Sequence, residues 1–332
     1  MAEALSGKTV LVTGATGFLG GALSLRLASE GAWVRALARH PEKGAFLREA
    51  EGVEIVKGNI TQADQINDLF KECDLVFHTA ASTSGTIEKQ RNNTVIGAQN
   101  VTRAAVNAGV ERLIHVSTIA VYGYRLSGDI TEDTPQRPGH DPYNIAKAEA
   151  EKALREIAGE HGLPYSIIRP GMIYGPRSNM WTGELFKLAK RRPTPFIGRG
   201  QGSTFPIYVD DVLDMMLILA THPAAVGEAF HCTPDPSPTW REFLSGYSKL
   251  AGHQSWLPIP PILFKAFAAI VGVVARPQTQ AKALPDLVYL AQQRVTFKMS
   301  KARDLLGWQP KVDLQHGIQQ CAPWLREQGL LD

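Results

Sequence analysis

Short runs of β-branched and other apolar residues alternate with longer amphipathic stretches through the first half of the chain. Such short runs are typical of buried strands, whereas longer stretches with helical spacing indicate helices. The runs predict strands at Thr9–Thr13, Trp33–Leu37, Val53–Lys57, Leu75–Thr79, Leu113–Ser117 and Tyr165–Arg169. Between them we expect helices near Phe18–Ser29, Ala63–Phe70, Asn93–Ala108 and Tyr143–His161. The alternation indicates βαβ units and predicts an α/β fold with a doubly wound parallel sheet.

The pattern changes after Arg169, where prolines and glycines crowd residues 170–176 and 192–206. Helices expected in this part have no paired strand, except that a later strand near Glu228–Cys232 returns to the sheet. We therefore expect a sheet domain over residues 1–170, with 207–232 returning to it. A smaller, interleaved C-terminal region, over 171–206 and 233–332, is expected to bind a substrate.

The composition argues against a nucleic-acid-binding protein and against a disulfide-rich or metal-binding one. The chain has 332 residues, 44% hydrophobic and 20% charged, and its net charge of +3 comes from 35 basic and 32 acidic residues without dense basic clusters. Nucleic acid is therefore not an expected partner. Cys73, Cys232 and Cys321 are odd in number and far apart, so neither a disulfide framework nor a metal site is expected. We expect a reducing, cytoplasmic location and no signal peptide.

The longest apolar run, Ile262–Ala275, contains Lys265 and is shorter than the roughly 20 residues that a spanning helix needs. We expect no transmembrane segment. Two interpretations stay open for this run: a helix packed in the C-terminal region, or a lid that makes weak contact with a membrane surface.

A glycine-rich turn follows the first predicted strand. The chain reads Gly14-Ala-Thr16-Gly17-Phe18-Leu19-Gly20 and then continues as a helix. Gly14 permits the tight turn, Gly17 lets a pyrophosphate approach the backbone, and Gly20 lets the helix pack on the strand. Free N–H groups and the positive end of the helix dipole would face the phosphates. The turn predicts a nicotinamide dinucleotide in a Rossmann fold, against the alternative of a packing turn without ligand.

The end of the second strand bears on the choice of cofactor. An acidic residue there accepts hydrogen bonds from the adenosine ribose, whereas an arginine can hold a 2′-phosphate. In this chain Ala38 is followed by Arg39. We therefore favour NADP(H) over NAD(H), with a solvated surface arginine as the alternative interpretation.

Tyr143 and Lys147 are four residues apart on one predicted helix. This spacing places the phenol and the ammonium one turn apart on the same face, where the cation can lower the pKa of the phenol. The pair predicts a general acid/base. The spacing alone is common, so its weight depends on the surrounding motifs.

Those motifs extend along nearly the whole chain, which resembles the extended short-chain dehydrogenase/reductase family. The matching segments are the Gly14–Gly20 turn, Asp74-Leu-Val-Phe-His-Thr-Ala-Ala81, Val116-Ser-Thr-Ile-Ala-Val-Tyr-Gly123, Tyr143 with Lys147, Arg169-Pro-Gly-Met-Ile-Tyr-Gly-Pro176, Val209-Asp-Asp-Val212 and Ser300-Lys-Ala-Arg-Asp-Leu-Leu-Gly-Trp308. The resemblance implies a catalytic set of Thr118, Tyr143 and Lys147, with Ser117 as a second candidate for the position of Thr118. In such a set the hydroxyl and the phenol share the substrate oxygen while hydride passes to or from C4 of the nicotinamide.

The resemblance also implies further cofactor contacts. Those positions are Asn59 and Ile60 beside adenine, Thr79, Ala80 and Ala81 near the pyrophosphate and ribose, Lys147 at the nicotinamide ribose, and Pro170 and Ile173 around the nicotinamide. The family usually has aspartate where Asn59 stands. Its helix motif usually reads Asn-Val-x-Gly-Thr, and Asn93-Thr94-Val-Ile-Gly97-Ala98 stands in its place.

Family members that act on nucleotide-sugars carry an aromatic residue and asparagine after the sixth-strand arginine, and a later arginine that binds diphosphate. Here Arg169 is followed by Pro-Gly-Met, and Thr204 stands at the later position. The chain looks closer to the 3β-hydroxysteroid dehydrogenase-like branch. We therefore expect an NADP(H)-dependent oxidoreductase on a hydrophobic hydroxy or keto substrate, sterol-like or β-keto. The alternatives are an NDP-sugar epimerase or dehydratase with bound NAD, and a redox-inactive dinucleotide-binding scaffold.

Helices of this family that correspond to Asn93–Ala108 and Tyr143–His161 often pair in a dimer. Both are rich in alanine here, which allows close packing. The resemblance therefore implies a homodimer.

Overall fold

The computed structural model describes residues 5–263 and 284–332. The chain divides into two compact units of three segments each. Unit one comprises Met1–Val121, Pro142–Arg169 and Leu213–Phe230, and unit two comprises Tyr122–Asp141, Pro170–Val212 and His231–Asp332. Residues 122–141, expected in the sheet domain, thus group with unit two. The apolar run predicted as a helix over 262–275 lies, from residue 264 onward, outside the described residues.

A seven-stranded sheet forms the centre of unit one, as the alternating pattern predicted. Its strands are β1 (Thr9–Thr13), β2 (Trp33–Ala38), β3 (Val53–Lys57), β4 (Leu75–His78), β5 (Arg112–Val116), β7 (Tyr165–Pro170) and β11 (Ala229–Cys232). They run in the order β11-β7-β5-β4-β1-β2-β3, and β1 pairs in parallel with both β2 and β4. The strand order reverses at β1, so that the carboxyl ends of β1 and β4 border the crevice where doubly wound folds bind ligands.

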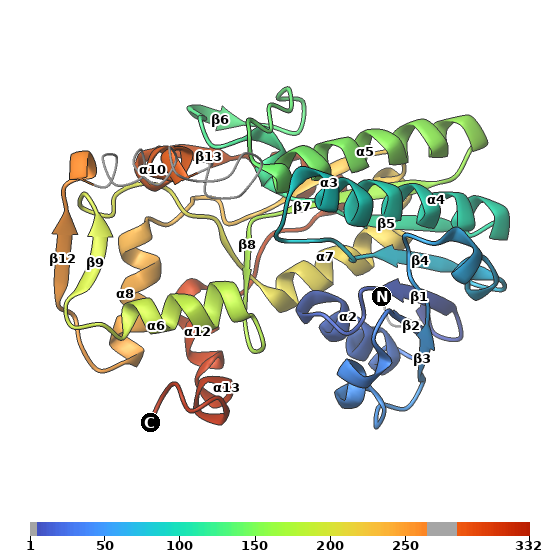
Figure 1. Cartoon of the computed structure of the whole chain (residues 1–332), viewed down its shortest axis with the longest axis horizontal. Coiled ribbons are helices and arrows are strands. Elements are labelled where there is room, and N and C mark those ends of the chain that lie inside the picture. The colour runs from blue at the N-terminus through green and yellow to red at the C-terminus, as the bar shows by residue number, and fades with distance from the viewer. Residues whose placement is uncertain (1–4, 264–283) are drawn as a thin grey trace. The chain divides into compact units, whose positions relative to one another are not determined.

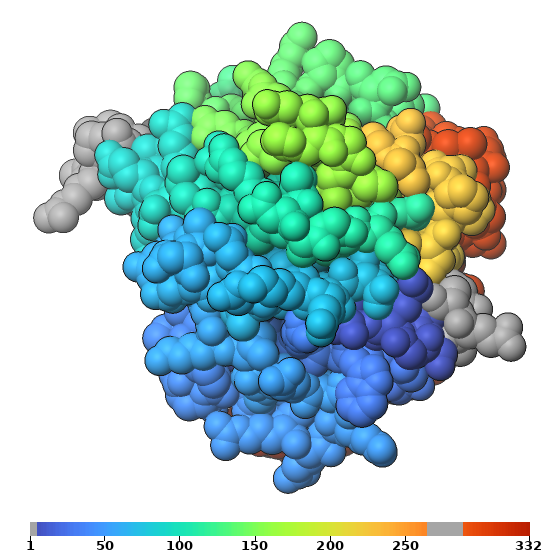
Figure 2. Space-filling view, turned by 90° about the vertical axis from the view of Figure 1, so that its right-hand side faces the viewer, coloured from blue at the N-terminus to red at the C-terminus, as the bar shows by residue number. Residues whose placement is uncertain are grey.

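Helices cover both faces of this sheet. They are α2 (Phe18–Ser29), α3 (Ile87–Gln90), α4 (Gly97–Ala108) and α5 (Pro142–His161), with the 3-10 helices η1 (Pro41–Leu47), η2 (Ala63–Gln65), η3 (Asn67–Phe70), η5 (Ile119–Tyr122) and η7 (Pro223–Ala225) and the π-helix η4 (Arg91–Ile96). In Figure 1, α4 and α5 lie together over one face and α2 lies over the other. Figure 2 shows α4 and α5 side by side at the surface of unit one. Helix α7 (Val209–Thr221) crosses the division between the units.

Two helix predictions in unit one needed correction. The stretch predicted as one helix over Ala63–Phe70 forms two short 3-10 helices instead. The helix predicted from Asn93 begins as the π-helix η4 and becomes α-helical only at Gly97. Apolar side chains of both stretches still reach the core, since Ile66, Phe70 and Val101 are fully buried in one cluster. Periodicity located the buried positions but not the type of helix.

Unit two contains three two-stranded parallel pairs that the sequence analysis missed. They join β8 (Met172–Tyr174) with β10 (Pro206–Tyr208), β9 (Thr194–Ile197) with β12 (Trp256–Ile259), and β6 (Gly128–Ile130) with β13 (Val295–Phe297). The expectation that only the strand near Glu228–Cys232 would occur after Arg169 was therefore wrong. Strands of three or four residues, half of which contain proline, are too short to show a readable alternation, and their partners lie far away in the sequence.

Unit two contains seven described helices and a cluster of aromatic rings. The helices are the π-helix η6 (Asn179–Glu184) and helices α6 (Leu185–Ala189), α8 (Trp240–Leu250), α10 (Leu284–Gln292), α11 (Ser300–Leu306), α12 (Leu314–Gln320) and α13 (Ala322–Glu327). The ring of Tyr174 packs edge-on against Tyr208 and Phe243, with centroids 5.5 and 5.6 Å apart. Among the helices that the structure describes, none is both long enough and apolar enough to cross a membrane.

Candidate active site

A pocket of about 470 Å³ opens at the carboxyl ends of β1, β2, β3 and β4 in unit one. Most of the cofactor positions predicted from the sequence line it. They are Gly14, Thr16, Gly17, Arg39, Asn59, Ile60, Thr79, Ala80 and Ala81. The structure thus brings together residues from four separate strand ends, as expected for a dinucleotide site at this point of the fold.

The turn at the entry of α2 has the geometry that its glycines predicted. Gly14 has a positive φ of 69°, and a Cβ there would lie 2.9 Å from the backbone of Ala80. Gly17 is the N-cap of α2 and provides no side-chain cap, so the first N–H groups of the helix remain available to an anion. A Cβ at Gly20 would lie 2.4 Å from Gly14 O. Any larger residue at position 20 would push the turn away from the helix.

Hydrogen bonds tie the ends of β1 and β4 together beneath this turn. The Thr79 hydroxyl donates to the Thr13 carbonyl at 2.6 Å, and Ala80 N donates to the Thr13 hydroxyl at 3.2 Å. The Thr13 hydroxyl also bonds His78 Nδ1 at 2.8 Å. Thr79 and Ala80 are therefore held in place by the first strand rather than by a ligand.

The far end of the pocket, at the end of β2, is basic. Arg39, His40 and Lys43 all line it, and the described residues that line the pocket include neither aspartate nor glutamate. His40 also lies 3.3 Å from the exposed carboxylate of Glu42. Sequence reasoning identified Arg39 and missed His40 and Lys43. The run Arg39-His-Pro-Glu-Lys43, directly after the second predicted strand, was the signal that could have revealed them.

The positions at the adenine side differ in what their side chains do. Asn59 lines the pocket, and its Oδ1 accepts a hydrogen bond from Thr61 N at 3.2 Å. Asn93, in the irregular motif of η4, also lines the pocket. Its neighbour Thr94 is buried and accepts a hydrogen bond from Ser82 N at 3.3 Å. The π-helical turn therefore directs Asn93 toward the pocket and Thr94 toward the loop after β4.

Lys147 is a buried cation of unit one. It lies on α5 one turn after Tyr143, its side chain is 3% exposed, and its Nζ donates to the Val116 carbonyl at 2.7 Å. Burial lowers the pKa of Lys147 from 10.5 to about 8, and the nearby Glu151 carboxylate partly offsets this effect. An ammonium held in a region of low polarity acts strongly on neighbouring groups. Tyr143, which is half-buried, is the titratable group on the same helix face one turn earlier.

The two hydroxyl candidates, Thr118 and Ser117, differ in their surroundings. Its side chain is 8% exposed and accepts a hydrogen bond from Ala120 N at 3.2 Å, which leaves the hydroxyl proton available. Ser117 is 2% exposed, and among the described residues its hydroxyl has no partner at normal hydrogen-bond geometry. It nevertheless lies close enough to Glu151 to help lower the pKa of that carboxyl. Ser117 is thus oriented toward the interior.

Some predicted cofactor positions do not line the pocket. Phe18 and Leu19 are half-buried in the first turn of α2, and Gly20 is buried beneath the loop. Pro170 and Ile173 belong to unit two, where Ile173 pairs with Ile207 between β8 and β10. The roles assigned to all of these residues stay predictions.

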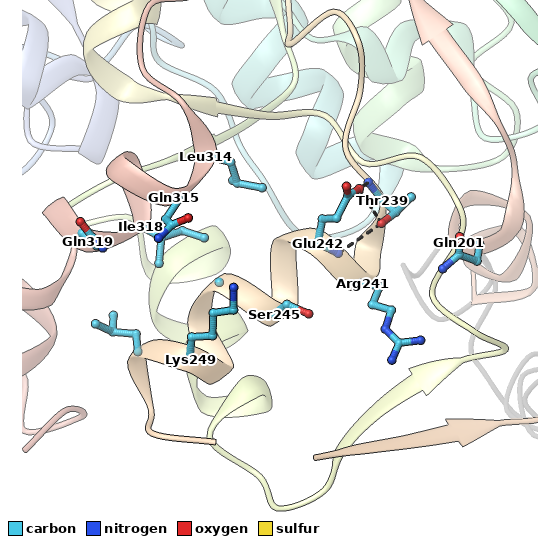
Figure 3. A pocket seen from close by; sticks show the side chains of 12 residues that line it. Gln201, Thr239, Arg241, Glu242, Ser245, Lys249, Leu314, Gln315, Ile318 and Gln319 are labelled. Carbon is cyan, nitrogen blue, oxygen red and sulfur yellow. Dashed lines mark hydrogen bonds between the residues drawn. The ribbon is translucent and has the colours of Figure 1, made fainter. Parts of the chain in front are cut away.

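Unit two has a separate pocket of about 680 Å³ between α8 and α12. Figure 3 shows Arg241 and Lys249 on α8 and Gln315 and Gln319 on α12 around it. Its carboxylate, Glu242, is occupied by hydrogen bonds with Thr239 in a capping box. None of the predicted site residues lines this pocket.

Comparison with known proteins gives both a family and individual relatives. The model of the NAD dependent epimerase/dehydratase family matches residues 10–232. The chain is 31% identical over 317 residues to a 4-hydroxy-2-methyl-3-oxo-4-farnesyl-3,4-dihydroquinoline-1-oxide ketoreductase of Stigmatella aurantiaca, covering 92% of this chain and 93% of the relative. It is 27% identical over 327 residues to a UDP-glucose 4-epimerase of Vibrio cholerae, covering 95% and 94%.

Two further similarities fit the same family. A 3beta-hydroxysteroid-dehydrogenase/decarboxylase of Arabidopsis thaliana is 30% identical over 290 residues, covering 81% of this chain and 66% of the relative. The solved structure of an epimerase from Methanothermobacter thermautotrophicus superposes with a TM-score of 0.78 at 24% identity, covering 99% and 95%. This last similarity concerns the fold. Reductases, steroid dehydrogenases and epimerases thus share one scaffold with this chain.

The close contact at Gly20 generates a first prediction. Gly20→Ala should weaken NADPH binding by about fivefold to a hundredfold, because relieving the contact with Gly14 O moves the turn at a cost of about 1–3 kcal/mol. Binding is measured by the fluorescence of NADPH. Gly159→Ala on α5 is the matched control, since a Cβ there meets nothing within 4 Å. Equal NADPH affinity in both variants would refute the role of Gly20.

The burial of Lys147 generates a second prediction, on stability. Its lowered pKa means that keeping the ammonium protonated at pH 7 destabilises the folded state by about 3 kcal/mol relative to the unfolded state. The hydrogen bond to the Val116 carbonyl contributes about 1 kcal/mol of stability in the opposite direction. Lys147→Met should therefore raise the free energy of unfolding by about 2 kcal/mol at pH 7. The gain should shrink as the pH rises from about 8 towards 10.5, where the folded wild type is already neutral.

Urea unfolding of both proteins at pH 7 and pH 9.5 measures this difference. We expect Lys147→Met to be the more stable protein and to turn over no substrate. A variant less stable than the wild type at pH 7 would show that Lys147 is a structural cation.

Proposed function

Because this chain belongs to the NAD-dependent epimerase/dehydratase family and is an enzyme of the extended short-chain dehydrogenase/reductase type, we propose that it interconverts a secondary alcohol and a ketone on a hydrophobic substrate. The observation that carries the proposal is the buried Lys147 ammonium one turn from Tyr143, anchored on the carbonyl just before Ser117 and Thr118. Buried ionisable groups with strongly shifted pKa values cluster at sites of acid/base chemistry, which supports this role for Lys147.

The proposed roles follow from the positions of the side chains. Thr118 donates a hydrogen bond to the substrate oxygen, and Tyr143 donates the proton that this oxygen takes up on reduction. Lys147 stabilises the resulting phenolate and binds the nicotinamide ribose. The nicotinamide, when bound, supplies hydride to the carbonyl carbon or accepts it from the alcohol. In the oxidative direction Tyr143 takes the proton from the alcohol.

The basic end of the pocket supports NADP(H) as the cofactor. Arg39, His40 and Lys43 surround the position expected for the adenosine 2′-hydroxyl, and a carboxylate there would instead accept hydrogen bonds from a free ribose. A 2′-phosphate would place additional negative charge among these side chains. The preference for NADP(H) therefore rests on two basic residues beyond the predicted arginine.

The residue at position 204, a buried threonine, supports an apolar substrate rather than a nucleotide-sugar. Thr204 is 0% exposed, and its hydroxyl donates to the Pro238 carbonyl at 3.0 Å. Family members that act on nucleotide-sugars carry a diphosphate-binding arginine at this position. In this chain the position holds an uncharged threonine. Relatives named as a farnesylated quinoline ketoreductase and as a 3beta-hydroxysteroid dehydrogenase agree with an apolar substrate, sterol-like or β-keto.

A second candidate is an NDP-sugar epimerase with tightly bound NAD, which the similarity to the Vibrio cholerae epimerase favours. Absorbance of the purified protein and turnover with apolar ketones, alcohols and nucleotide-sugars distinguish the two functions. The proposed oxidoreductase consumes NADPH with apolar ketones, and Tyr143→Phe abolishes this turnover. Co-purified NAD with turnover of nucleotide-sugars alone would establish the epimerase. The homodimer implied by the family for α4 and α5 stays a prediction.

The cofactor preference generates a third prediction. Arg39→Gln should weaken NADPH binding by about tenfold to a hundredfold, because a charge-assisted hydrogen bond to phosphate contributes about 1.5–3 kcal/mol. The affinity for NADH should change less than twofold, since NADH carries no 2′-phosphate. Fluorescence titration with both cofactors measures this ratio. Arg48→Gln, an exposed arginine outside the pocket lining, is the control, and an equal loss for NADH and NADPH would contradict the assignment.

A further inference from the structure

A buried ion pair lies next to Lys147. Glu151 follows Lys147 by one turn of α5, and its side chain is 1% exposed. Its two oxygens accept hydrogen bonds from Arg169 Nε at 3.0 Å and Arg169 Nη2 at 2.7 Å. Arg169, near the end of β7, is 4% exposed. The pair is thus bidentate and shielded from water, the geometry in which a guanidinium holds a carboxylate most firmly.

The helix alone would favour a different pairing. Lys147 and Glu151 stand at positions i and i+4, where oppositely charged side chains normally meet. The Lys147 ammonium instead donates to the Val116 carbonyl at 2.7 Å, while the carboxylate bonds to Arg169. Arg169 therefore engages the carboxylate that the helix places nearest to Lys147.

Three cations interact with the Glu151 carboxylate. Arg169 bonds it directly, Arg155 Nη2 lies 3.8 Å from it, and Lys147 interacts with it electrostatically. Burial raises the pKa of Glu151, but the hydrogen bonds and charge of Arg169, the Ser117 hydroxyl and the charge of Arg155 together lower it below its ordinary value, so the carboxylate is ionised at neutral pH. Among the described residues, two buried histidines of the sheet interact electrostatically with Lys147. Burial holds the pKa of His78 on β4 and His115 on β5 well below 6.5.

We propose that Arg169 is a positioning residue that keeps Glu151 from pairing with Lys147, so that the ammonium acts on the Tyr143 phenol. The proposal rests on the roles of Tyr143 and Lys147 given above. A direct Lys147–Glu151 pair would neutralise the ammonium locally and remove its effect on the phenol. Bidentate capture of the carboxylate by Arg169 leaves the Lys147 ammonium hydrogen-bonded to the Val116 carbonyl, one turn from Tyr143, and its charge favours the phenolate.

Two substitutions should move the titration of Tyr143 in opposite directions. Arg169→Met leaves Glu151 free to pair with Lys147, and the titration midpoint of the phenol should rise by about 1 pH unit. Glu151→Gln removes the anion but keeps Arg169, and the midpoint should fall by about 1 pH unit. The double variant Glu151→Gln/Arg169→Met removes one negative and one positive charge, so the net charge near Tyr143 stays that of the wild type. The midpoint of the Tyr143 phenol should therefore lie within about 0.3 pH unit of the wild-type value.

Ultraviolet difference spectroscopy of phenolate formation tests this without any substrate. Each variant of the full chain is titrated with and without Tyr143→Phe, and the difference isolates Tyr143. Burial raises the pKa values of Tyr174, Tyr208 and Tyr247, which keeps these phenols out of the working range. Since this readout needs no turnover, its outcome is independent of which substrate the enzyme uses. The basic limb of kcat/KM should shift with the same signs once an active substrate is known.

Variants that preserve the fold complete the test. Arg155 is 37% exposed, so Arg155→Gln removes one of the three cations with little disturbance and should raise the midpoint by about 0.3 pH unit. Lys152→Gln on the same helix, with a side chain 77% exposed, makes the same charge change and should leave the midpoint where it is. Arg169→Lys keeps the charge and should stay closer to the wild type than Arg169→Met.

Opposite shifts for Arg169→Met and Glu151→Gln support the proposal. Shifts of the same sign, or none, show that the ion pair is only structural and overturn it. If neither Arg169→Met nor Glu151→Gln folds, the comparison of Arg155→Gln with Lys152→Gln decides. A higher Tyr143 midpoint in Arg155→Gln alone supports the proposal, and equal midpoints in the two variants overturn it. Failure of the proposed redox function would appear separately, as absence of turnover in a wild-type protein whose Tyr143 titration still follows these signs.

Discussion

The burial of one ammonium group, that of Lys147, is the constraint on which the rest of the site depends. Taking a lysine out of water is costly, and the lowered pKa, about 8, measures that cost. The fold offsets part of it with the Val116 carbonyl at the carboxyl end of β5 and with the charge of Glu151. The Val116 carbonyl immediately precedes the two hydroxyl candidates. One hydrogen bond thus joins the Lys147 ammonium to the segment that carries Ser117 and Thr118.

The dinucleotide pocket depends on a second constraint, the close approach of two strand ends. The backbone of Ala80 packs against Gly14, and Thr13 bonds both Thr79 and Ala80, so β1 and β4 end in one rigid crevice. Helix α2 begins directly above, with its N–H groups directed at the place where phosphates would bind. Strand order, glycine turn and helix start therefore meet at one pocket, whose lining at the end of β2 includes Arg39, His40 and Lys43; its role as a phosphate site stays a prediction.

The sheet of unit one and the glycine-rich turn could be predicted from the sequence, because short-range patterns of residues determine these elements. The strands of unit one are buried apolar runs, and β1 and α2 have the predicted bounds because a glycine turn separates them. The short parallel pairs of unit two were missed, since their partners are distant in sequence and too short for alternation to show. The pair of Glu151 with Arg169 was missed for the same reason: eighteen residues separate two charges that only tertiary packing brings together. The chemical roles of Thr118, Tyr143 and Lys147 came from motifs and stay predictions.

Transfer of deuterium from the cofactor tests the central claim, that these residues form a redox site, most directly. The enzyme is incubated with an apolar β-keto substrate and NADPH that carries two deuterium atoms at C4, and the product is examined by mass spectrometry. We predict one deuterium on the carbinol carbon for each NADP⁺ formed, and none with Tyr143→Phe. Formation of an epimerised nucleotide-sugar with no NADP⁺ released, and no deuterium in any alcohol, would contradict it.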